Sequence, residues 1–108
     1  MATNRFFQDD AWRTGHLDGC SVEKLVGDDA LVFLKPRDRA WQRFYLDAGL
    51  GFWQETEEPE DQPRVDFGAR FGVVGQRIGR IRCEPGPRIR VEIGEGELVL
   101  DGDGVRFA

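Results

Sequence analysis

The stretch that decides the fold is RIGRIRCEPGPRIRVEIGEGELVLDGDGVRF, residues 77–107. Within it, Ile89, Val91 and Ile93 alternate with charged residues, as in an antiparallel strand that has one buried face and one wet face. Turn signals rich in glycine and proline separate the short apolar runs, at spacings of roughly 8 to 12 residues. The stretch therefore predicts a mainly β chain, an antiparallel meander that forms a small barrel or a sandwich.

The last of these turns, DGDG at residues 101–104, has the look of a calcium-binding loop. An EF-hand loop needs an oxygen ligand at its fifth position and a glycine at its sixth, and here these positions hold Val105 and Arg106. Asp-Gly pairs also supply the positive φ angles of tight hairpin turns. We therefore predict a hairpin turn here rather than a calcium site.

Most of the remaining chain reads as strands, and three segments need separate arguments. Residues 40–47, AWQRFYLD, match one face of a helix, but their aromatic content favours a strand. The glycines of residues 65–74, VDFGARFGVV, predict a bulged or bent strand. Residues 3–14 allow one short N-terminal helix, capped by Thr3 and ended by Gly15.

Composition limits the classes of function. The chain has 108 residues, which is the size of a single domain, and its formal net charge of −5 disfavours nucleic-acid binding. No apolar run is long enough to span a membrane, and the N-terminus does not read as a secretory signal. We therefore expect a cytoplasmic protein that binds neither nucleic acid nor membranes.

The sequence offers little for catalysis or metal binding. It lacks the motifs of serine hydrolases, phosphate-binding loops and zinc proteases. Its soft metal ligands are His16, Cys20 and Cys83, which have no paired spacing, so we predict neither a metal nor another cofactor. A disulfide between the two cysteines is left open. Most carboxylates lie in a solvated loop, which is a poor place to raise a pKa for acid catalysis, so a non-enzymatic protein is favoured.

The acidic loop at residues 55–66, ETEEPEDQPRVD, is the first candidate site. Pro59 and Pro63 prevent regular strand pairing there. Phe52 and Trp53 precede it and point to opposite faces of a predicted strand, so one packs inward and the other lies beside the acidic loop, unless both are covered. Exposed aromatic residues next to charge are typical of protein-binding surfaces. The candidate partner-binding residues are Trp53, Glu55, Glu57, Glu58, Glu60 and Asp61.

The second candidate site is an arginine stripe, which consists of Arg80, Arg82, Arg88 and Arg90. If residues 83–87 form the hairpin loop, Arg82 faces Arg88 and Arg80 faces Arg90. Like charges directly opposite each other are destabilising, so counter-charges are needed. They come from Glu92 and Glu97, from the acidic loop, or from the carboxylate or phosphate of a partner or ligand that the stripe binds.

These features favour a protein-interaction module, in its sharpest form an acidic inhibitor or immunity-type protein that masks a partner with a basic surface. The alternative is a small β-barrel that binds an anionic small molecule through the arginine stripe. An unpaired edge strand would also allow a homodimer. We expect the acidic loop to be mobile, to face solvent and to lie on a different side from the stripe, because exposed ion pairs are too weak to order it.

Overall fold

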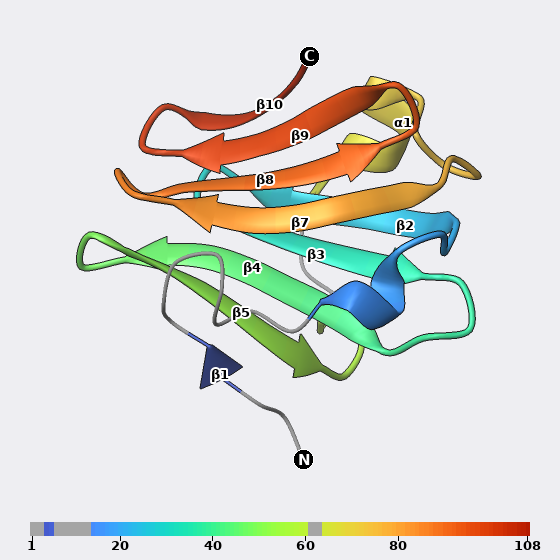
Figure 1. Cartoon of the computed structure of the whole chain (residues 1–108), viewed down its shortest axis with the longest axis horizontal. Coiled ribbons are helices and arrows are strands. Elements are labelled where there is room, and N and C mark those ends of the chain that lie inside the picture. The colour runs from blue at the N-terminus through green and yellow to red at the C-terminus, as the bar shows by residue number, and fades with distance from the viewer. Residues whose placement is uncertain (1–3, 6–13, 61–63) are drawn as a thin grey trace.

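The computed structural model describes residues 4–5, 14–60 and 64–108, and it contains two antiparallel sheets packed face to face (Figure 1). The strand order is β1-β5-β4-β3-β2-β6 in one sheet and β10-β9-β8-β7 in the other. The strands are β1 (Asn4–Arg5), β2 (Val22–Asp28), β3 (Leu31–Pro36), β4 (Trp41–Asp47), β5 (Leu50–Thr56), β6 (Val65–Asp66), β7 (Ile78–Glu84), β8 (Arg88–Ile93), β9 (Gly96–Asp101) and β10 (Gly104–Phe107). The mainly β prediction is confirmed, in its sandwich form, because the two sheets do not close into a barrel.

Alternating side chains build the core between the sheets. Ile89, Val91 and Ile93 of β8 are buried, as their spacing predicts. Residues 41–47 form strand β4, so the aromatic content of this segment outweighs its helical pattern. Phe44 of β4 points into the core, opposite Trp53 of β5.

The two sheets approach each other closely at a glycine. Gly51 of β5 has no side chain, and a Cβ atom there would lie 2.5 Å from Sγ of Cys83 on β7. Cys83 is buried, and no disulfide joins it to Cys20. The thiol of Cys83 therefore fills the space between β5 and β7 and packs against the backbone of Gly51.

Backbone hydrogen bonds also join the sheets at one edge. Gly19 donates to the carbonyl of Ile78 at 2.7 Å, Ile78 donates to Cys20 at 2.7 Å, and Val22 donates to Gln76 at 2.8 Å. The chain just before β2 is thereby fixed to the start of β7, which limits sliding of one sheet over the other.

Residues 65–74 are not the bent strand that their glycines predict. After β6 they form the short helix α1 (Phe67–Phe71), because Asp66 accepts a hydrogen bond from the backbone N–H of Ala69 at 3.1 Å. Phe67 and Phe71 stack one helical turn apart at 5.5 Å. Gly72 ends the helix in the left-handed conformation, with φ of 66°.

The expected N-terminal helix at residues 3–14 falls largely on residues 6–13, which lie outside the described part of the chain. Asn4 and Arg5 form strand β1 beside β5 instead of a first helical turn. Gly15 does not end a helix but begins the short 3-10 helix η2 (Gly15–Leu17). Among residues 4–5, 14–60 and 64–108, no helix has the length and apolarity needed to cross a bilayer.

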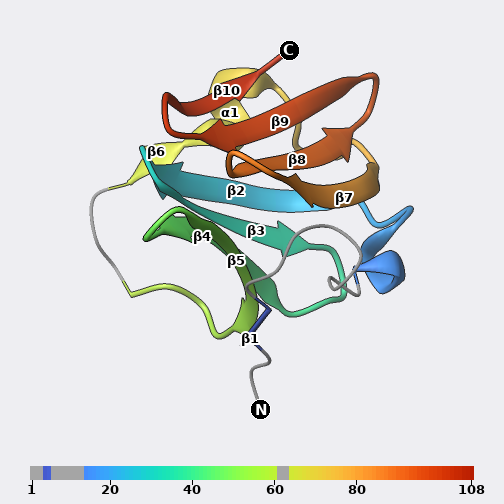
Figure 2. The same cartoon turned by 60° about the vertical axis from the view of Figure 1, so that its left-hand side comes forward.

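The connection from β5 to β6 decides where the acidic loop lies. Strands β4, β3 and β2 separate these two elements in the sheet, as Figure 2 also shows. Four strand spacings of about 4.8 Å make a path of about 19 Å. Residues 57–64 connect the two strands, and the nine Cα–Cα steps from Thr56 to Val65 reach at most about 30–32 Å when fully extended. The connection is therefore long enough to pass over the three strands that lie between β5 and β6.

Candidate functional site

The described residues of the connection, 57–60 and 64, lie over the outer face of the six-stranded sheet, which is the face turned away from the four-stranded sheet. On β4 this face carries Trp41, Arg43 and Tyr45, which alternate with the inward-pointing residues of the strand. Phe52 of β5 stacks on Tyr45, with ring centroids 4.8 Å apart. The outer face therefore presents aromatic and cationic side chains, although an outer sheet face is usually polar.

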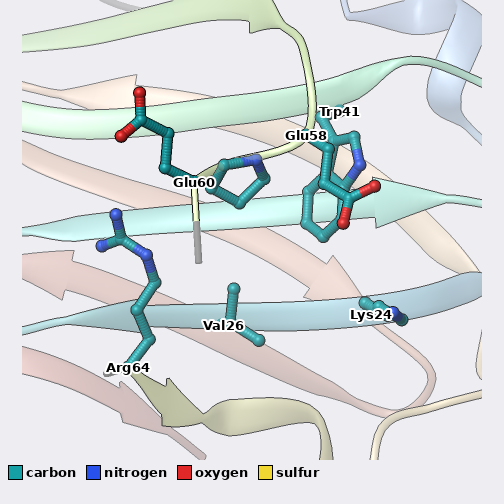
Figure 3. Close-up of a pocket in the computed structure, with 7 residues that line it drawn as sticks. Lys24, Val26, Trp41, Glu58, Glu60 and Arg64 are labelled. Carbon is teal, nitrogen blue, oxygen red and sulfur yellow. The ribbon is translucent and has the colours of Figure 1, made fainter. Parts of the chain in front are cut away.

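The acidic segment, residues 57–60, lies over this face with a hollow on each side. One hollow of about 500 Å³ is lined by the segment together with Lys24, Val26, Trp41 and Arg64. The other, of about 440 Å³, is lined by the segment together with Phe33, Arg43, Thr56 and Arg64. Figure 3 shows the first hollow, with Glu58 beside Trp41 at one end, Glu60 and Arg64 toward the other, and Val26 on the floor between them. We call the two hollows together the groove.

The carboxylates of the acidic segment face solvent. Glu57, Glu58 and Glu60 are exposed, and within the described residues none of the three forms an ion pair or a side-chain hydrogen bond. Asp61, the fifth predicted carboxylate of the loop, lies outside the described residues. The segment therefore presents a row of unpaired negative charges above the groove.

Two arginines line the groove beneath these carboxylates. The guanidinium of Arg64 lies 4.8 Å from the ring centroid of Phe33, and that of Arg43 lies 4.7 Å from the centroid of Tyr45. Nη2 of Arg43 also donates to Oε1 of Gln54. The Nε atoms of both arginines are buried and have no hydrogen-bond acceptor among the described residues. Sequence reasoning missed these arginines, because their proximity depends on the crossing connection.

Trp53 is not the exposed aromatic residue that the sequence suggested. Its side chain is only 4% exposed, and its Nε1 donates to Oε1 of Gln42 at 2.6 Å. Gln42 in turn donates to Oε2 of Glu55 at 3.2 Å, and Nε2 of His16 lies 3.4 Å from the same oxygen. Trp53 is thus buried and held by polar contacts, which makes it a poor candidate for partner contacts, whereas Glu55 lies at the exposed end of this chain of contacts, with its side chain 37% exposed. Adjacent residues of a strand point to opposite faces, so Trp53 and Phe52 lie on different sides of the sheet. Trp53 lies on the inner face, which the second sheet covers.

The arginine stripe lies on the outer face of the other sheet, in a register that differs from the predicted one. Glu84 pairs with Arg88, and Arg82 pairs with Arg90, so the hairpin loop holds only residues 85–87. The predicted loop of residues 83–87 is wrong, because Cys83 and Glu84 continue the strand with Cys83 buried in the core. Only one arginine pair is therefore directly opposed.

Glutamates of the same sheet neutralise that pair. Arg82 lies 3.5, 3.5 and 3.1 Å from carboxylate oxygens of Glu84, Glu92 and Glu97. Arg90 lies 2.6 Å from oxygens of both Glu84 and Glu97. These contacts lower the pKa of the Glu84 carboxyl, chiefly through its hydrogen bond from Arg90, and raise the pKa of Arg90. Arg82 and Arg90 thus find their counter-charges on their own sheet, and the stripe lies apart from the described part of the acidic segment, as predicted. The mobility of the segment stays a prediction.

A second arginine–carboxylate cluster forms at the last hairpin. Arg106 donates two hydrogen bonds, at 2.9 and 2.7 Å, to the two oxygens of Asp101, and Nε of Arg88 lies 3.3 Å from the same carboxylate. The backbone N–H of Asp103 also donates to Asp101 at 2.9 Å. These donors, Arg106 first, hold the pKa of Asp101 well below its usual range. The DGDG motif is therefore a hairpin turn between β9 and β10, as predicted.

Within the described parts of the chain, no group of three or more His, Cys, Asp or Glu side chains is placed to hold a metal ion. No family model, curated protein or solved structure matches this chain. The arguments about its function therefore rest on the two outer faces. On one of them Arg82, Arg88 and Arg90 are paired with carboxylates, and on the other the carboxylates of the acidic segment form no ion pair among the described residues.

Proposed function

We propose that this chain is a non-enzymatic, cytoplasmic protein-interaction module whose acidic segment binds a partner with a basic surface. The observation that carries this proposal is the contrast between the two outer faces. Glu84, Glu97 and Asp101 are held by arginines of their own sheet, whereas the carboxylates of the acidic segment have no cationic partner among the described residues. A partner can bind these unpaired carboxylates without breaking contacts inside the protein.

Charge and shape act together at this face. Exposed carboxylates accelerate the approach of a basic partner and fix its orientation. The groove beside the acidic segment offers Trp41 and Pro59 for apolar contact. Trp41 is itself only 8% exposed, so in this proposal it forms part of the wall of the groove and does not insert into the partner. An acidic inhibitor or immunity-type protein is the narrower form of the same proposal.

The alternative, an anionic small molecule bound by the arginine stripe, has less support. Arg82 and Arg90 already share the carboxylates of Glu84 and Glu97. An anion would have to displace at least one of these glutamates and leave it beside the ligand. The geometry therefore favours a structural role for the stripe.

The proposal is tested by NMR titration of the labelled protein with an acetylated and amidated decapeptide in which arginine alternates with serine and phenylalanine. We expect shifts in the backbone amides of residues 56–60 and in the indole of Trp41, and weaker binding as salt is added. The variant E57Q/E58Q/E60Q should lose this binding.

The matched control is D18N/D47N/E95Q, which changes the net charge equally at three exposed carboxylates elsewhere on the surface. It should bind the decapeptide as the wild type does. Equal losses in the two triple variants would mean that the peptide responds only to net charge, and the proposal would then be wrong. The same conclusion follows if the shifts map to the four-stranded sheet.

A further inference from the structure

The groove contains unpaired charges of both signs. Lys24, Arg43 and Arg64 line its two hollows, and the segment above contributes its three glutamates. No ion pair joins the two sets among the described residues. A ligand that carried only positive charge would satisfy the glutamates and leave the arginines as they are.

Arg43 and Arg64 are placed for a specific acceptor. Each guanidinium lies over an aromatic ring, and both residues line the hollow of about 440 Å³. Their Nε–H groups are shielded from solvent and have no acceptor among the described residues. Leaving a charged donor unsatisfied is costly, and a carboxylate matches the fork that Nε and Nη of arginine present together. At Arg43 the carboxylate would take the place of Gln54 on Nη2.

We propose that the groove binds a segment of a partner chain that carries a carboxylate beside its basic residues. The carboxylate binds to Arg43 and Arg64, and the neighbouring basic side chains pair with Glu57, Glu58 and Glu60. This inference rests on the proposed function and adds the identity of the recognised segment. The hollows, of about 500 and 440 Å³, fall within the range of roughly 300–1,000 Å³ that is usual for ligand sites.

Charge complementarity argues for a mixed segment rather than a free anion. A lone carboxylate or phosphate that enters the groove passes three glutamates, which repel it. A segment that brings positive charges with its carboxylate turns this repulsion into attraction. The acidic segment thus selects against simple anions, while the two arginines select for one acidic group within a basic sequence.

The test uses two decapeptides of equal length, both acetylated and amidated. The basic peptide is the one described above, and the mixed peptide has one central serine replaced by aspartate. We expect the mixed peptide to bind the wild-type protein about tenfold more tightly, although it carries less positive charge. In the variant R43Q/R64Q this gain should vanish, while the basic peptide binds at least as well as before.

Two controls make the result specific. The variant R39Q/R70Q removes two exposed arginines outside the groove and should keep the tenfold preference. The variant R43K/R64K keeps both charges without the guanidinium fork and should lose most of the preference, with an unchanged melting temperature as proof of folding.

The outcomes separate the two proposals. Equal affinity for both peptides overturns the mixed-segment inference and leaves the proposed function standing. Failure of both peptides to bind overturns both. Acetate or inorganic phosphate that binds at Arg43 and Arg64 as tightly as the mixed peptide also overturns the inference, because the site would then belong to a free anion.

Discussion

Asp101 illustrates at the scale of one residue how the four-stranded sheet compensates its charges. Its side chain is 8% exposed and accepts hydrogen bonds from Arg106 and from the backbone of Asp103. We predict that D101N destabilises the protein by about 1–2 kcal/mol, because it leaves arginine donors without their anion. Urea denaturation measures this, and D103N, at an exposed neighbour, should change stability little.

The same carboxylate sets the direction of the response to acid. The pKa values of Asp101 and Glu84 are lowered in the folded protein, so the unfolded chain binds protons more tightly. Their stabilising contribution is complete above the unfolded values near 4 and is lost as the pH falls below them. The unfolding free energy of D101N should therefore fall less steeply than that of the wild type below pH 4. Parallel curves would contradict this account.

Individual side chains were predictable in part. Parity along β5 correctly places Phe52 and Trp53 on opposite faces, but it cannot tell which face a second sheet will cover. The stripe arginines were identified as a group that needs counter-charge, and Glu92 and Glu97 were correctly named among the sources. Arg43 could have been noticed from the alternation of Trp41, Arg43 and Tyr45, which is unusually aromatic for an outer face. Arg64 lies outside that pattern.

At the scale of elements, the contact between Gly51 and Cys83 offers a sharp test of the sandwich. We predict that G51A costs about 1–3 kcal/mol, because its methyl group would overlap the thiol of Cys83. Adding C83A should restore much of the loss, since the second change frees the volume that the first one fills. Chemical denaturation of the single and double variants measures the coupling.

G102A is the matched control for this pair, because a Cβ atom at Gly102 meets nothing within 4 Å. It should cost little. If G51A were harmless, or if C83A failed to rescue it, the two sheets would not meet as described.

Strands β7 to β10 were predictable from the alternation of apolar and polar residues. Helix α1 was missed because its cap at Asp66 and its end at Gly72 are residue types that also occur in a bent strand.

At the scale of the whole molecule, the acidic segment should contribute little to folding. We predict that E57Q/E58Q/E60Q melts within a few degrees of the wild type, because these glutamates form no ion pairs among the described residues. The substitutions remove the mutual repulsion of the three glutamates, so any effect of this on the melting temperature should be an increase. A loss of several kcal/mol would show that the segment supplies counter-charge to Lys24, Arg43 or Arg64.

The path of the acidic segment was the main feature that the sequence did not reveal. Its composition predicts a solvated loop, and the exposure of Glu57, Glu58 and Glu60 agrees with that. The strand order, which places β5 and β6 four positions apart, is what carries the segment over Trp41 and the two arginines. Strand order depends on long-range pairing, which local patterns do not encode.

A homodimer through an edge strand stays a prediction.

The crossing of the sheet has a consequence for the thermodynamics of recognition. A binding loop that is free at its tip must give up conformational entropy when a partner orders it, at about 1–2 kcal/mol per residue. The described residues 57–60 follow directly from β5 and line two hollows with side chains of β2, β3 and β4 of the same sheet. An acidic segment that stays mobile would lose this entropy on binding, whereas one ordered by these neighbours would meet its partner preorganised and would keep the corresponding affinity.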